Sequence, residues 1–287
     1  MHMTMTEKLV WYYNIFILSY ILCFINSFEY AIPLVLIHIV FMLFWPGLAL
    51  FRQKLKRKYI QYLFFIIPIV LLSIFHYETG LINTLLFPNY FDYIIKHLDS
   101  FIFGIHFNQI LSQFYNYFLI DQFFHFVYFL YYIVLLLPVS ILYFSRNHQK
   151  NYHEKMLFSI MMSAFMYFVI FFIFPVIGPI QDRAVLHLFN DAGGFVAVMD
   201  YLFKVGDLDG GAMPSSHVGL SVIVYLNTRK YLPAISMYVL VVMLLISIAT
   251  IYCSYHYTVD VIVGYLTAYI FWIISNRVYN RLIKQSL

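Results

Sequence analysis

Long apolar stretches alternate with short polar connections along most of the chain. Eight of these stretches approach or reach the length needed to cross a hydrocarbon core of about 30 Å as a helix. They lie near residues 11–28, 30–51, 59–76, 122–145, 156–178, 215–228, 232–253 and 257–276. The pattern predicts an all-α fold, a polytopic membrane bundle of about eight transmembrane helices.

The composition excludes the common alternatives to a membrane protein. Hydrophobic residues make up 63% of the 287 residues and charged residues only 10%, whereas soluble domains carry about 25% charged residues. Disordered chains have the opposite composition, with low hydrophobicity and high net charge. The two cysteines, Cys23 and Cys253, lie in apolar stretches, so a disulfide scaffold is also excluded.

Lysine and arginine are divided unequally between the two sides of the predicted bundle. Fourteen of the 17 fall on the side of the amino terminus, and only Lys96, Arg183 and Lys204 fall on the other. The positive-inside rule therefore predicts that both termini are cytoplasmic, and it explains the basic cluster at 52–58 as a topogenic, lipid-facing patch instead of a nucleic-acid site. Most acidic residues lie on or near the opposite face. We expect the chemistry on that extracytoplasmic or lumenal face.

One polar cluster is the segment Gly206-Asp-Leu-Asp-Gly-Gly-Ala-Met-Pro-Ser-Ser-His217, which runs directly into an apolar stretch. A glycine-rich loop that opens a helix exposes backbone N–H groups at the positive end of the helix dipole, and such an end binds anions. Ser215 and Ser216 add hydroxyl donors, so phosphate is the expected occupant. For this motif alone, an ordinary capped helix with an isolated histidine is the alternative. Asp207 and Asp209 stand just before it, and we expect them to act at most as a gate or cap.

A second polar cluster, His256 to Asp260, lies at the outer end of the last apolar stretch. These two residues are four apart and would share one helix face, so the carboxylate can hold the imidazole in one tautomer. Ionisable residues at a membrane span are costly to place and are often functional, although a satisfied polar pair is the alternative. His217 and His256 both fall on the outer face. The stretch 215–228 reaches only about 21 Å as a helix, so we expect a site sunk below the membrane surface, where a lipid head group enters laterally.

At these residues the chain resembles the type 2 phosphatidic acid phosphatase superfamily, whose later motifs read Pro-Ser-Gly-His and Ser-Arg-x5-His-x3-Asp. They appear here as Pro214-Ser-Ser-His217 and His256-x3-Asp260. The resemblance implies that His256 is the nucleophile of a phosphohistidine intermediate, that Asp260 orients it, and that His217 protonates the leaving oxygen. It also implies that no metal is required.

Two features depart from the superfamily pattern. Thr250 stands where an arginine is expected six residues before the nucleophile, and the Lys-x6-Arg-Pro motif is missing. In its place the segment 174–183 is similar to that of the inositol phosphorylceramide synthase-like branch, and weaker matches to this branch lie at 98–104 and 121–128. Arg183 is therefore the candidate for a bidentate phosphate contact, with a loop salt bridge as the alternative. The last motif also resembles that of sphingomyelin synthases.

The likeness covers about residues 98–264. We expect N-terminal transmembrane helices over residues 1–90 and, over residues 91–287, a catalytic membrane domain that transfers or hydrolyses phosphorylated lipid head groups. The expected partners are membrane lipids and a phospholipid, sphingolipid or polyprenyl phosphate substrate, and not nucleic acid. The alternatives are a plain lipid phosphatase acting on phosphatidate or polyprenyl pyrophosphate, and a non-catalytic scaffold or lipid transporter. The sequence does not indicate an oligomeric state.

The other histidines are scattered without metal-ligand spacing. We expect packed or interfacial positions for residues such as His76, with His125 and His187 as the nearest additional candidates for the site. The chain has no His-Glu-x-x-His, Cys-x-x-Cys, phosphate-loop or dinucleotide-binding motif. We therefore expect neither a metal site nor a cofactor.

Overall fold

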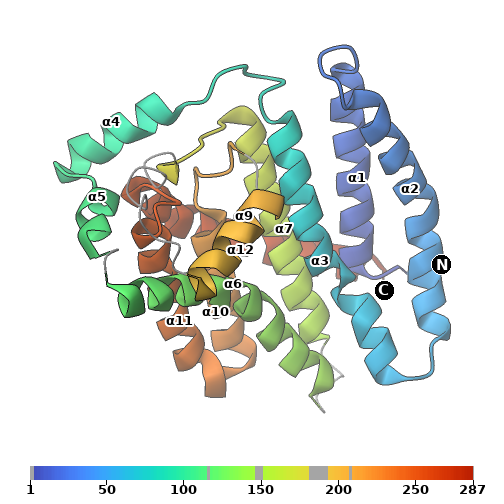
Figure 1. Ribbon diagram of the computed structural model, residues 1–287. Coiled ribbons are helices and arrows are strands. Elements are labelled where there is room, and N and C mark those ends of the chain that lie inside the picture. The colour runs from blue at the N-terminus through green and yellow to red at the C-terminus, as the bar shows by residue number, and fades with distance from the viewer. Residues whose placement is uncertain (1–2, 115–116, 146–150, 181–192, 207–208, 287) are drawn as a thin grey trace.

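The protein is a bundle of α-helices (Figure 1), seen in a computed structural model that describes residues 3–114, 117–145, 151–180, 193–206 and 209–286. The helices are α1 Met5–Cys23, α2 Ala31–Lys54, α3 Lys58–Ile82, α4 Asp92–Phe103, α5 Phe107–Leu111, the 3₁₀ turn η1 Ser112–Phe114, α6 Phe118–Phe144, α7 Tyr152–Ile173, α9 Gly194–Gly206, α10 Ser216–Tyr231, α11 Pro233–Tyr252 and α12 Thr258–Ser286. The predicted all-α fold is confirmed.

The eight predicted spans all fall on helices, namely α1, α2, α3, α6, α7, α10, α11 and α12. Within the described residues, six helices are long and apolar enough to cross a membrane: α2, α3, α6, α7, α11 and α12. Of the other two, α1 has 19 residues and α10 has 16. The polytopic character is thus confirmed, but the number eight is not. The long outer connections carry α4, α5 and α9, which the hydrophobic pattern did not indicate.

The three N-terminal helices are joined by a buried polar cluster. Nδ1 of His38 on α2 lies 2.5 Å from Oδ1 of Asn14 on α1, and its Nε2 contacts Glu78 on α3. Asn14 Nδ2 donates to the His38 carbonyl at 3.1 Å. Polar groups within a bilayer need protein partners, so the cluster ties α1, α2 and α3 together at the edge of the bundle, where Figure 1 shows α1 and α2 side by side.

The other half of the bundle is packed around α10, which contacts α6, α7, α11 and α12. Two glycines set the close approach of these helices. A Cβ on Gly219 would overlap the Tyr167 hydroxyl of α7, and a Cβ on Gly264 of α12 would lie 2.8 Å from the Ser215 carbonyl oxygen. Because any larger side chain would push the helices apart, these glycines fix where α10 begins relative to α12. The candidate active site lies at this end of both helices.

Candidate active site

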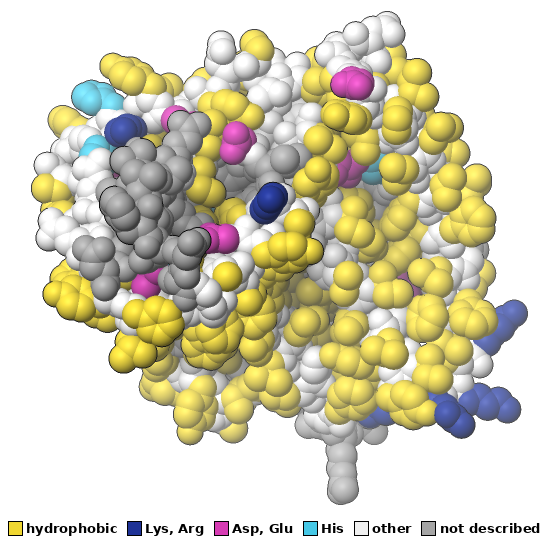
Figure 2. All heavy atoms as spheres, viewed as in Figure 1, with side chains coloured by type: hydrophobic (Ala, Val, Ile, Leu, Met, Phe, Trp, Pro, Cys, Tyr) yellow, Lys and Arg dark blue, Asp and Glu magenta, His cyan; other side chains and the backbone are white. Residues whose placement is uncertain are grey.

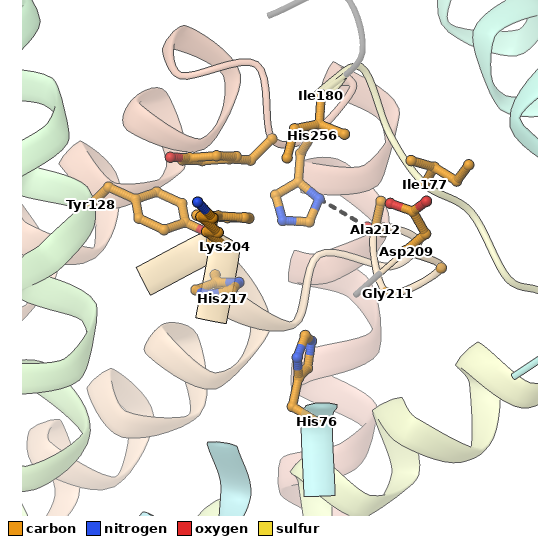
Figure 3. A pocket seen from close by; sticks show the side chains of 13 residues that line it. His76, Tyr128, Ile177, Ile180, Lys204, Asp209, Gly211, Ala212, His217 and His256 are labelled. Atoms are coloured by element: carbon orange, nitrogen blue, oxygen red, sulfur yellow. Dashed lines mark hydrogen bonds between the residues drawn. The ribbon is translucent and has the colours of Figure 1, made fainter. Parts of the chain in front are cut away.

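A polar cavity of about 270 Å³ lies where α6, α9 and the start of α10 meet the turn between α11 and α12. Besides two tyrosines, its polar side chains are His76, Lys204, Asp209, His217 and His256 (Figure 3). The structure thus brings together the two histidines that the sequence singled out, although they lie 39 positions apart in the chain.

His256 is positioned by the turn that follows α11. The carbonyl of Thr250 accepts the amides of both Tyr255 and His256, at 3.0 and 3.2 Å. Ser254 takes a left-handed backbone conformation with φ of 55°, which is uncommon for a residue other than glycine. The chain therefore reverses within four residues, and His256 projects into the cavity just before α12 begins.

The hydrogen bond of the His256 ring decides which nitrogen can react. Its Nδ1 lies 2.9 Å from the carbonyl oxygen of Ala212, as the dashed line in Figure 3 shows. A carbonyl can only accept, so Nδ1 carries the hydrogen in the neutral ring and Nε2 keeps its lone pair. This is the tautomer that a nucleophilic imidazole needs when it attacks through Nε2.

Asp260 lies on the first turn of α12, fully buried. Its Oδ2 is 3.6 Å from Nδ1 of His256 and accepts the amide of Tyr257 at 2.8 Å. The carboxyl group is thus close enough to stabilise a positive charge on the imidazole, while the Ala212 carbonyl makes the shorter contact. The carbonyl of Asp260 accepts the Ser215 amide at 3.1 Å, so the two motifs are joined through their backbones.

His217 lies in the first turn of α10, between two tyrosines of α6. Its ring centroid is 4.9 Å from that of Tyr128 and 4.3 Å from that of Tyr131. These contacts hold the imidazole facing His256, whose ring centroid is 6.1 Å away. Both rings line the same cavity, so a phosphoryl group bound in it could contact both histidines.

Neither serine of the first motif lines the polar cavity. Ser215 is the N-cap of α10, where its hydroxyl accepts the Val218 amide at 3.4 Å. Ser216 lines a second, apolar cavity. The amides of Ser216 and His217 have no hydrogen-bond partner among the described residues, so they are the groups of this helix end that remain for an anion. Substrate binding by Ser215 and Ser216 stays a prediction.

The loop at 209–212 forms one wall of the cavity and is anchored at both sides. Ala212 donates its amide to the Val176 carbonyl at 2.8 Å, and Val176 donates to Gly210 at 3.2 Å. Asn83, which follows α3, donates to the Asp209 carbonyl at 2.7 Å. Gly210 has φ of 109°, and a Cβ there would overlap the Asn83 amide. The carbonyl of Ala212 that orients His256 is therefore held in place from two directions.

Two aspartates of α4 brace the neighbouring segments. Asp92 accepts the amides of Ile177 and Gly178 at 2.9 and 2.8 Å, and Asp99 accepts the amide of Val259 at 3.0 Å. Burial raises the pKa of the Asp92 carboxyl, while its hydrogen bonds to these amides lower it. The segment around Asp99, noted in the sequence only as a weak match, thus holds the start of α12 beside the active site.

Comparison with known proteins identifies the family. The profile of the PAP2 superfamily matches residues 95–274. The chain belongs to the PAP2 superfamily. It is also similar to a "PA-phosphatase related-family protein" of Dictyostelium discoideum, at 33% identity over 102 residues, which is 33% of this chain and 18% of the relative. The chain therefore matches less than a fifth of that relative's length, and no solved structure matches.

The segment matched to the PAP2 superfamily contains His217, His256 and Asp260, but not the whole cavity wall. His76 comes from α3, which lies outside the matched segment. Lys204 lies inside that segment, in the last turn of α9. The sequence alone predicts a packed or interfacial position for His76 and no role for Lys204. Lys204 could have been noticed as one of the few basic residues on the outer side, whereas nothing in the local sequence marks His76.

The remaining predicted positions have different surroundings in this PAP2 superfamily member. Thr250 is buried, and its hydroxyl donates to the Ser247 carbonyl at 2.8 Å, so its side chain is turned into α11. His125 is buried on α6 beside Asp121 and does not line the cavity. Arg183, His187 and Asp207 lie outside the described residues. Among the residues that are described, no group of three or more His, Cys, Asp or Glu side chains has a geometry for a metal ion.

Proposed function

We propose that this protein is an integral membrane enzyme that transfers or hydrolyses phosphorylated lipid head groups through a phosphohistidine at His256. The observation that carries the proposal is the orientation of His256. Its Nδ1 is held by the Ala212 carbonyl, so the reactive Nε2 is free of a proton and shares a cavity with His217. Membership of the PAP2 superfamily supports a lipid phosphatase type of function.

In the first half of the reaction, the Nε2 lone pair of His256 attacks phosphorus and the bond from phosphorus to the lipid oxygen breaks. The electron pair leaves on that oxygen, which takes a proton from His217 on the opposite side. The imidazole becomes positively charged when the P–N bond forms. The Ala212 carbonyl at 2.9 Å and the Asp260 carboxyl at 3.6 Å both stabilise that charge.

In the second half, the neutral His217 removes a proton from the acceptor hydroxyl. The acceptor oxygen attacks phosphorus, the P–N bond breaks, and Nε2 recovers its lone pair. The same two histidines therefore serve both halves, and neither step needs a metal. Arg183, Ser215 and Ser216 remain our candidates for contacts to the phosphoryl oxygens, together with the amides of the first turn of α10.

The acceptor distinguishes two forms of this function. A second lipid's hydroxyl would give a head-group transferase of the inositol phosphorylceramide synthase type, which the segment ending in Arg183 favours. Water would give a plain lipid phosphatase acting on phosphatidate or polyprenyl pyrophosphate, and the similarity to a phosphatase-related protein favours this form. Both use the same phosphoenzyme.

We propose that the site faces the extracytoplasmic or lumenal side and that both termini are cytoplasmic. The uneven distribution of lysine and arginine supports this orientation. In Figure 2 several Lys and Arg side chains gather at one end of the molecule, and most visible Asp and Glu side chains lie toward the other.

The test is turnover of purified protein in mixed micelles with a panel of phospholipids, sphingolipid acceptors and polyprenyl pyrophosphates, in the presence of a chelator. We expect either free phosphate or a new phospholipid, and a loss of about 10⁴-fold or more in His256→Ala. Substrate labelled in its phosphate should leave an acid-labile, alkali-stable label on the wild-type protein only.

The two products identify the acceptor, since free phosphate means water and a new phospholipid means a lipid hydroxyl. Activity that survives in His256→Ala would refute the proposed nucleophile. Absence of turnover with every substrate would favour a scaffold or transporter, and loss of activity with chelator would refute the metal-independent mechanism.

A further inference from the structure

A second cavity, of about 330 Å³, adjoins the polar one and has a different wall. His76, Phe203 and His217 line both cavities. The other wall residues of the second cavity are mostly apolar side chains of α3, α6, α7 and α10. We call it the apolar chamber, with Ile69, Leu72, Leu135, Leu136, Phe168 and Leu220 among its wall residues.

The apolar chamber lies deeper along the helices than the polar cavity. On α6, Tyr128 lines the polar cavity, while Tyr131 and Leu135 line the chamber farther from the outer end of the helix. The same order holds on α10, where His217 borders both spaces and Leu220 borders only the chamber. Because α6 and α10 both begin on the side of the active site, the chamber extends from the catalytic histidines toward the middle of the bundle.

The chamber also reaches the outer surface of the bundle. Val70 on α3 and Val205 on α9 both line it, and they are 58% and 51% exposed. Ser73, one turn from Val70, is exposed as well. In a membrane-spanning bundle, an apolar opening on the side of a span faces hydrocarbon and not water. The mouth between α3 and α9 is therefore open to lipid.

We infer that the apolar chamber binds the hydrocarbon chain of the lipid whose phosphoryl group is held between His217 and His256. This inference rests on the proposed function. The bond that breaks would lie at the boundary of the two cavities, because His217, which protonates the leaving oxygen, is on the wall of both. The leaving group is thus a hydrophobic alcohol that stays on the chamber side, while the phosphoryl group stays on the polar side.

Helix α3 would then take part in substrate recognition. This helix lies outside the segment matched to the PAP2 superfamily, yet it supplies one wall of the chamber and, through His76, part of the boundary. Chain selectivity would therefore depend in part on α3, whereas both histidines of the proposed reaction come from the matched segment.

The test is photolabelling with a hexadecylphosphonate that carries a diazirine at the far end of its chain. The P–C bond cannot be hydrolysed, so the experiment reports binding even without turnover. We expect crosslinks to chamber residues of α3 and α6, read by mass spectrometry, and suppression of these crosslinks by excess unlabelled hexadecylphosphonate. Probe dissolved in the surrounding lipid would also label the outer surface of the bundle, but excess unlabelled hexadecylphosphonate would not suppress that labelling.

Substitutions at the mouth provide the matched comparison. Val70→Trp and Val205→Trp should weaken the suppressible labelling by about tenfold, the loss expected when about two methylene groups can no longer be buried. Leu63→Trp on α3 is the control, because Leu63 is 57% exposed but lines neither cavity; it should label like the wild type.

The outcomes separate this inference from the proposed function. Suppressible crosslinks outside the chamber, no suppressible crosslink at all, or equal effects of the mouth and control substitutions would each overturn the chamber assignment. Such a result would leave turnover through His256 untouched, because turnover is measured separately. If the chamber is crosslinked as expected but the wild-type protein takes up no phosphate label from substrate, the phosphohistidine mechanism is refuted and the chamber assignment stands.

Discussion

Replacing Asp260 with asparagine isolates the electrostatic role of this residue. The Asp260 carboxyl has two contacts, the Tyr257 amide at 2.8 Å and the His256 Nδ1 at 3.6 Å. An asparagine Oδ1 can still accept the Tyr257 amide, so the turn before α12 keeps its hydrogen bond. The Ala212 carbonyl still holds the tautomer of His256. The substitution therefore removes the charge and little else.

The size of the effect follows from Coulomb's law. Two unit charges 3.6 Å apart interact by about 4–5 kcal/mol at an effective dielectric constant of about 20. Only part of the imidazolium charge has developed in the transition state, so the loss should be smaller, about 3–4 kcal/mol. We expect kcat/KM to fall about 10²- to 10³-fold in Asp260→Asn, clearly less than in His256→Ala.

The assay is kcat/KM of purified variants in the same mixed micelles, with Asp200→Asn on α9 as the control for removal of a carboxylate, since Asp200 lines neither cavity. A fall as large as that of His256→Ala would mean that Asp260, and not Ala212, sets the tautomer. A fall of less than about fivefold would mean that the carboxyl is not ionised in the reacting enzyme. Either result would refute the division of roles between the carbonyl and the carboxyl.

Three further substitutions test other parts of the structure. Glu78→Leu should lower the free energy of unfolding by about 1–3 kcal/mol by removing the partner of a buried histidine; an unchanged melting temperature in detergent would show that the cluster joining α1, α2 and α3 does not stabilise the fold. Gly264→Ala should lower the free energy of unfolding by about 1–3 kcal/mol and reduce turnover, because the new Cβ would lie 2.8 Å from the Ser215 carbonyl oxygen. Gly47→Ala is the control and should change neither property, because nothing lies within 4 Å of its Cβ. Equal melting temperatures of the two variants would contradict the close packing at Gly264. Lys204→Met should raise KM about tenfold with a smaller change in kcat, as expected for loss of a charge-assisted contact to phosphate; an unchanged KM would exclude Lys204 from substrate binding.

The helices of the bundle could be predicted because each needs only a local signal, a run of apolar residues. The missed helices are those whose stability depends on contacts far away in the sequence. Helix α4 is anchored through Asp92 to the segment that follows α7 and through Asp99 to the start of α12. The apolar stretch of α10 was recognised and counted as one of the eight spans. With 16 residues, however, this helix is shorter than the roughly 20 residues of a full span.

The candidate site could be predicted in part for the same reason. His217, His256 and Asp260 stand in short motifs, so their types and spacing are visible in the sequence. Their partners are not: the Ala212 carbonyl lies 44 positions from His256, and any residue could supply such a carbonyl. His76 was missed because its place in the cavity depends on how α3 packs against the rest of the bundle.

The backbone hydrogen bond from Ser215 to Asp260 has a consequence for motion. Together with the contact at Gly264, it locks the beginnings of α10 and α12 to each other. Sliding of these two helices past each other would break these contacts, so we expect His217 and His256 to keep their relative positions. Any widening of the cavity would then come from the wall that α3 and α9 supply, which would leave the spacing of the two histidines unchanged.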